Sequence, residues 1–174
     1  MKSNLNRIAS AGLLAGALFG ILGSIFTSPV MQMVMYEISS VGLTAACVLL
    51  SIKFLNEKNE FIATGFLLLA IAEAVMSGGN ASGQIEGQAT FGAGMALYVP
   101  AFLFIGLSKG FPMWSRITII AASIPFLIAA SIIFSGGQVL STSPLPGAGY
   151  GLLSITIIGW VTFLFRQSNS KSLE

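Results

Sequence analysis

Two glutamates in apolar surroundings are the residues of this sequence best suited to chemistry. Glu73 lies within the apolar stretch 61–77, and no basic residue stands between Lys58 and Lys109. A carboxylate inside a membrane is costly and usually faces the interior of a helix bundle or a water-filled cavity. Because burial disfavours the charged form, we expect Glu73 to be protonated and to line such a cavity. The alternative is a structural role, in which the carboxyl group hydrogen-bonds a neighbouring helix.

Glu37 opens a polar stripe on the preceding apolar segment. The stripe continues with Ser40, Thr44, Cys47 and Ser51. Spacings of three and four residues place all of these side chains on one face of a helix. One hypothesis is the wall of a polar cavity that descends from Glu37. The other is a seam of small residues that packs against a neighbouring helix.

Two tyrosines complete the candidate ligand-binding set. Tyr98 lies within the segment 91–108 and Tyr150 at the start of 148–166, so both hydroxyl groups are at depths from which they could reach the two glutamates. With Glu86 in a loop on the same side, three carboxyl groups and no cation favour neutral or cationic ligands over anions. The candidate ligand-binding residues are therefore Glu73, Glu37, Tyr98, Tyr150, Ser40 and Thr44.

The missing residue types exclude several kinds of chemistry. The sequence has no histidine, no aspartate and a single cysteine. This removes the usual zinc and iron ligand sets, Ser-His-Asp catalysis and a disulfide scaffold, so we expect no cofactor, no metal and no catalytic residue. One metal alternative is Cu(I) held by Met31, Met33 and Met35, which requires an extended segment because a helix points Met33 away from the other two. Nothing in the sequence resembles a nucleic-acid-binding surface.

The composition indicates which elements position these residues. Only 8% of the residues are charged, 55% are hydrophobic, and the mean hydropathy is +0.88, whereas soluble domains are about 25% charged. This excludes a soluble domain and a disordered chain and indicates an integral membrane protein.

A helix needs about 20 apolar residues to cross the bilayer. We predict an all-α, single-domain bundle over residues 1–174, with six transmembrane helices at about 8–26, 36–55, 61–77, 91–108, 114–135 and 148–166.

The basic residues predict the orientation of the chain. All eight fall on one side of the predicted spans: Lys2, Arg7, Lys53, Lys58, Lys109, Arg116, Arg166 and Lys171. Because Lys and Arg near span ends are retained in the cytoplasm, we predict cytoplasmic N and C termini and three in-out-in hairpins in a bacterial inner membrane. A cleaved signal peptide is the alternative for the first span, but its apolar stretch is longer than that of a signal.

Four short motifs, spread over most of the chain, resemble a known family. They are Ile21-Leu22-Gly23-Ser24, Glu37, Ile71-Ala72-Glu73-Ala74-Val75 and Phe111-Pro112-Met113-Trp114. On these motifs the sequence resembles an uncharacterised family of small bacterial multi-pass membrane proteins, grouped under a domain of unknown function. The resemblance implies the same architecture and the two glutamate positions, with no agreed activity. A basic residue often stands three positions before the second glutamate in that family. Ala70 occupies this position here, which argues against a buried ion pair at Glu73.

Three hypotheses for function follow. The first is a bundle that binds or translocates a small neutral or cationic solute from an outer-facing cavity built by Glu37, Glu73, Tyr98 and Tyr150. The second is an accessory or assembly subunit whose polar seam binds partner membrane helices or a second copy of the chain. The third is a lipid-modifying enzyme, which a set of two carboxyl groups and a tyrosine supports poorly. An internal pocket favours the first hypothesis, and a solid core with an exposed Gly/Ala face favours the second.

Overall fold

The structure is a computed structural model that describes residues 2–83 and 85–170. These residues form helices joined by short connections, and no strand occurs among them. The helices are α1 (Lys2–Ile25), α2 (Pro29–Asn56), α3 (Glu60–Ala81), α4 (Gln88–Leu107), α5 (Met113–Phe134) and α6 (Pro144–Ser170).

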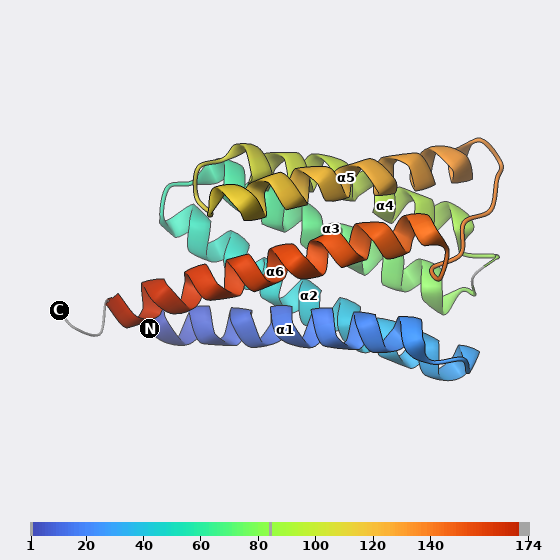
Figure 1. Cartoon of the computed structure of the whole chain (residues 1–174), viewed down its shortest axis with the longest axis horizontal. Helices are drawn as coiled ribbons and strands as arrows, with labels where there is room; N and C mark the ends of the chain where they lie inside the picture. The colour runs from blue at the N-terminus through green and yellow to red at the C-terminus, as the bar shows by residue number, and fades with distance from the viewer. Residues whose placement is uncertain (1, 84, 171–174) are drawn as a thin grey trace.

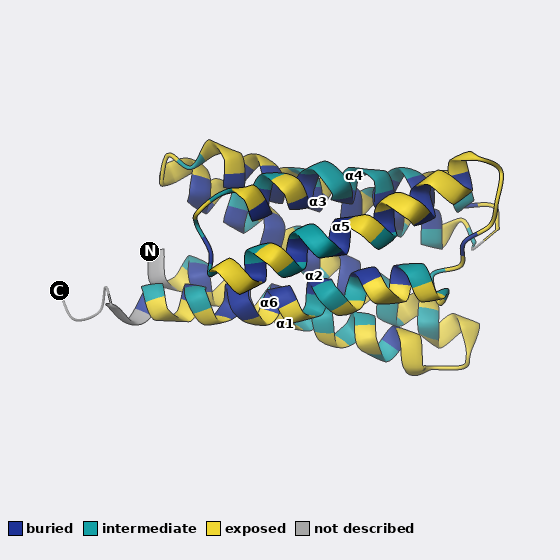
Figure 2. Cartoon of the chain, turned by 45° about the horizontal axis from the view of Figure 1, so that its top comes forward, coloured by how far each residue is buried: buried dark blue, intermediate teal, exposed yellow. Residues whose placement is uncertain are grey.

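All six helices are long and apolar enough to cross a membrane. Their outward faces, drawn as exposed in Figure 2, carry large hydrophobic side chains that a soluble protein would bury. Every helix contributes such residues, among them Leu18, Val41, Leu67, Leu107, Ile124 and Ile158. The predicted all-helical, multi-pass architecture is confirmed at this level.

Several helix boundaries differ from the prediction. α2 begins at Pro29, well before the expected start at residue 36. Proline is favoured in the first turn, where its fixed φ suits the helix and its missing N–H costs nothing. As a consequence Met31, Met33 and Met35 are helical. The extended segment that the Cu(I) alternative requires is therefore not present.

The six helices form a closed ring in chain order. Each helix contacts the next one along the chain, and α6 returns to contact α1. Consecutive helices run antiparallel, so α1 begins and α6 ends at the same end of the bundle (Figure 1). We call this end, which also holds the α2–α3 and α4–α5 connections, the basic end, because Lys53, Lys58, Lys109 and Arg116 lie there. The opposite end, with the α1–α2, α3–α4 and α5–α6 connections, is called the pocket end. Which end faces the cytoplasm stays a prediction, and Lys171 lies outside the described residues.

Aromatic side chains fill the ring toward the basic end. The rings of Phe66 on α3 and Trp160 on α6 lie 5.0 Å apart and bridge the bundle, and Phe111 packs against both. At the same end, Asn6 of α1 donates a hydrogen bond of 3.3 Å to the carbonyl oxygen of Leu164 on α6. These side chains pack the interior toward the basic end, and the cavity described below lies toward the pocket end.

Candidate functional site

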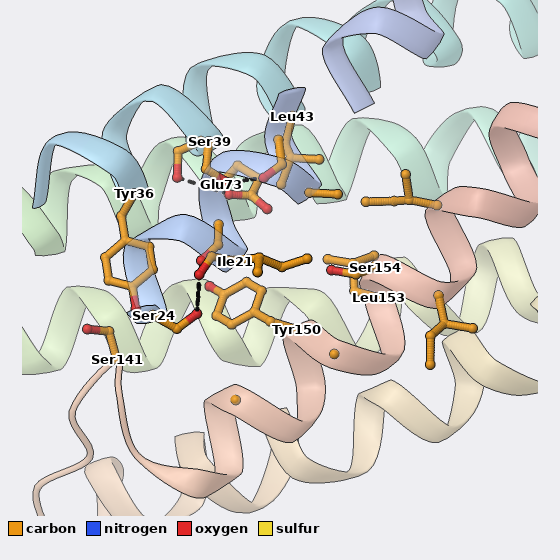
Figure 3. Close-up of a pocket in the computed structure, with 18 of the residues that line it drawn as sticks. Ile21, Ser24, Tyr36, Ser39, Leu43, Glu73, Ser141, Tyr150, Leu153 and Ser154 are labelled. Carbon is orange, nitrogen blue, oxygen red and sulfur yellow. Dashed lines mark hydrogen bonds between the residues drawn. The ribbon is translucent and has the colours of Figure 1, made fainter. Parts of the chain in front are cut away.

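A cavity of about 440 Å³ lies in the pocket half of the bundle. Its wall includes Gly16 of α1, Ser40 of α2, Glu73 of α3 and Tyr150 of α6. Figure 3 shows Glu73 and Tyr150 reaching into this space from different helices. The helix ring therefore brings together residues that are far apart in the sequence.

Glu73 is the acidic residue of the cavity wall. Its side chain is buried, with only 2% of the residue surface exposed. The Tyr98 hydroxyl group of α4 donates a hydrogen bond to Oε1, and Ser40 Oγ of α2 donates to Oε2 at 3.1 Å. No salt bridge to Glu73 occurs among the described residues. The carboxyl group is thus held by hydroxyl donors from the helices on either side of α3.

Tyr98 is positioned by ring contacts. It is fully buried, and its ring centroid lies 5.1 Å from that of Phe102 and 4.6 Å from that of Phe126. Phe102 belongs to α4, the same helix as Tyr98, and Phe126 belongs to α5, so the ring is held from both helices. The hydroxyl group can therefore meet Glu73 without ordering a flexible side chain, which lowers the entropic cost of the hydrogen bond.

Tyr150 forms the α6 side of the cavity. Its ring stands perpendicular to that of Tyr98, with 6.2 Å between the centroids. Its hydroxyl group donates to the sulfur of Met76 on α3 at 3.5 Å, a weak contact that a stronger acceptor could replace. Tyr150 thus offers the cavity a hydroxyl group close to the Tyr98 side chain that bonds Glu73.

Glu37 lies apart from the cavity lining. It is half-buried, and Ser77 Oγ of α3 donates a hydrogen bond to its Oε2. Its Oε1 is buried and has no hydrogen-bond partner among the described residues. Thr44, also half-buried, does not line the cavity either. Of the six candidate residues, Glu73, Ser40 and Tyr150 line the cavity, and Tyr98 reaches it through Glu73.

The polar stripe of α2 pairs with α3. Glu37 meets Ser77, and about one turn further along, Ser40 meets Glu73. Ser40 therefore fits both hypotheses for the stripe. It joins α2 to α3, as a packing seam would, and it forms part of the cavity wall.

The contribution of α1 and α6 to the cavity was not predicted from the sequence. Gly16 and Gly20 of α1 and Gly147 and Gly151 of α6 line it. Ser39 Oγ of α2 donates to the Gly16 carbonyl oxygen at 2.7 Å and holds α1 in place. The four-residue spacing of glycines in α1 is a signal of close helix contact that could have indicated this wall.

Hydroxyl and amide groups line the part of the cavity nearest to the pocket end. Tyr36 at the start of α2, Asn80 near the end of α3, and Ser141 and Thr142 before α6 lie there. No Lys or Arg is among the residues that line the cavity. Within the described residues, no group of three His, Cys, Asp or Glu side chains could hold a metal ion. The arrangement is suited to hydrogen-bonding a small ligand through one carboxyl group and several hydroxyl groups.

Comparisons of the chain with models of protein families, with curated proteins and with solved structures find no match. The geometry of the cavity is therefore the basis for a functional assignment.

Proposed function

We propose that this chain is a multi-pass protein of the bacterial inner membrane that binds a small neutral or cationic solute in the cavity beside Glu73. In this proposal the pocket end faces outward and both termini are cytoplasmic. The observation that carries it is a buried carboxyl group at the wall of a cavity of about 440 Å³, with no basic side chain in the lining. This volume falls in the range of about 300–1,000 Å³ that is typical of small-molecule sites.

The donors and acceptors of the wall define the ligand. In the ionised form of Glu73, each oxygen accepts one hydrogen bond from the protein and keeps a lone pair for a ligand donor. In the protonated form, the carbonyl oxygen keeps this acceptor capacity. An ammonium or hydroxyl group satisfies this acceptor, whereas a carboxylate or phosphate meets no compensating cation in the wall. The cavity therefore favours amines and alcohols over anions.

Binding is supported more directly than translocation. Phe66, Phe111 and Trp160 close the bundle between the cavity and the basic end. A solute could cross only if this aromatic layer separated. Translocation is therefore a second step, which the binding experiment below does not presuppose.

The assembly-subunit hypothesis requires a polar seam that is available to another helix. Within this chain, however, the seam of α2 is already bonded to α3 through Ser40–Glu73 and Ser77–Glu37. A partner helix would have to break both contacts. The internal cavity and the occupied seam together favour the ligand-binding function.

The test compares two glycines whose replacement meets no atom. An added Cβ has nothing within 4 Å at Gly151 or at Gly78, and both glycines are exposed. Gly151 of α6 lines the cavity, whereas Gly78 of α3 is not in its lining. Gly151→Phe adds a large side chain at the cavity lining, and Gly78→Phe, the matched control, adds the same side chain away from it.

Binding of alkyl amines, alcohols and carboxylates with matched chains is measured by equilibrium dialysis of the protein in nanodiscs. We expect amines or alcohols to bind, carboxylates to bind at least about tenfold more weakly, and Gly151→Phe to lose about tenfold in affinity. The control variant should bind like the wild type. If no amine or alcohol binds, or if both variants bind equally, the proposed function is wrong.

A further inference from the structure

The cavity wall contains residues that also form the outer surface of the bundle. Ile21 of α1 is 49% exposed, and Ile155 and Ile158 of α6 are 48% and 59% exposed, yet all of them line the cavity. A side chain can satisfy both conditions only at the edge of an opening. The cavity therefore opens sideways, between α1 and α6.

This opening lies at the depth of the lipid chains. Ile158 is roughly halfway along α6, about 21 Å from its start at Pro144. The hydrogen bond between the two helices, from Asn6 to the Leu164 carbonyl group, lies toward the basic end. Both helices carry apolar outer faces. With these helices crossing a bilayer, the opening borders its hydrocarbon.

The interior and the rim of the cavity differ in polarity. Glu73, Ser40 and Tyr150 supply polar groups to the interior. The exposed rim is mainly apolar at Ile21, Ile155 and Ile158, and Ser154 is the polar lining residue beside Ile155. A ligand that fits both regions has a hydrogen-bond-donating head and an aliphatic chain. The volume suits one chain, since about 440 Å³ corresponds to a drug-sized molecule.

We propose that the ligand is a single-chain amphiphile with a neutral or cationic head group, taken from the surrounding lipid. Its head group lies beside Glu73, and its chain lies along α6 in the opening between α1 and α6. This inference rests on the proposed function and specifies the class of its ligand.

The probe is dodecylamine with a photoreactive diazirine at the end of its chain, added to the full-length protein in nanodiscs. After illumination, labelled residues are located by mass spectrometry. We expect labelling on 155–158 of α6 and 17–21 of α1 that excess dodecylamine reduces about tenfold and that dodecanoate leaves unchanged. Gly151→Phe should abolish this competed labelling, and Gly78→Phe should retain it.

Two outcomes separate this inference from the proposed function. If butylamine binds in a manner sensitive to Gly151→Phe while dodecylamine does not, the cavity binds solutes but the amphiphile proposal is wrong. If labelling is spread over the lipid-facing residues of all the helices without competition, the proposal is likewise overturned. If no amine or alcohol of either chain length binds, both the amphiphile proposal and the proposed function are wrong.

Discussion

The hydroxyl group of Tyr98 donates a hydrogen bond to Glu73 Oε1 and thereby joins α4 to α3 at the wall of the cavity. Both residues are buried, and Ser40 adds a second donor from α2. The carboxyl group is consequently a structural junction of three helices as well as the candidate ligand acceptor. For substitutions at Glu73, both the free energy of unfolding and the ligand affinity must therefore be measured.

Glu73→Gln should change the free energy of unfolding by less than about 1 kcal/mol, because its amide can accept from Tyr98 and donate to Ser40. Glu73→Leu should cost about 1–3 kcal/mol, since Tyr98 is left without its acceptor. Ser40 can bond back to its own helix and adds less. Both values are measured by denaturant titration in detergent micelles. If the leucine variant is as stable as the wild type, Glu73 does not hold these helices together.

Tyr98→Phe tests the same contact from the other side. The ring contacts with Phe102 and Phe126 are kept, so only the hydroxyl group is lost. We expect a destabilisation of about 1–2 kcal/mol, which reports the unsatisfied carboxyl oxygen.

Combination of Tyr98→Phe with Glu73→Leu should cost less than the sum of the two single changes, because both remove one interaction. The coupling is obtained from a double-mutant cycle of unfolding free energies. Strict additivity would show that the two residues do not interact in the folded protein.

The number and approximate positions of the helices were predictable from hydropathy, because each span must be apolar over the thickness of the bilayer. The helix α2 begins at Pro29, before the span predicted from residue 36, because a helix can begin ahead of the stretch from which a span is predicted.

The candidate site was predictable only where one residue is unusual in its own surroundings. Glu73 is of this kind, and so is Ser40 through its spacing from Glu37. The pairing of Glu37 with Ser77 depends on the register of α2 against α3. The contribution of Gly16 and Gly151 depends on α6 closing the ring against α1. Neither register nor ring closure is encoded in local patterns, so these contacts required the structure.

Gly79 and Gly78 form a matched pair for testing the contact of α3 with α4. An added Cβ at Gly79 would lie 2.9 Å from the backbone nitrogen of Phe91 and 3.2 Å from the Gly87 carbonyl oxygen, whereas Gly78 faces open space. Gly79→Ala should therefore destabilise the protein by about 1–3 kcal/mol. Gly78→Ala should leave the unfolding free energy unchanged or raise it, because alanine favours helix. Equal effects of the two substitutions would contradict the close approach of these helices.

The orientation prediction can be tested with two exposed positions at opposite ends of the bundle. Asn56 lies at the end of α2, at the basic end, and Glu86 lies in the α3–α4 connection, at the pocket end. Asn56→Cys and Glu86→Cys are made separately in a Cys47→Ala background, since Cys47 is the one native cysteine. A membrane-impermeant thiol reagent applied to intact cells should label only the Glu86→Cys variant, because basic residues hold their end of the bundle in the cytoplasm. Both variants should be labelled after the cells are permeabilised, which controls for reactivity. Labelling of Asn56→Cys alone in intact cells would reverse the orientation and make the cavity beside Glu73 face the cytoplasm.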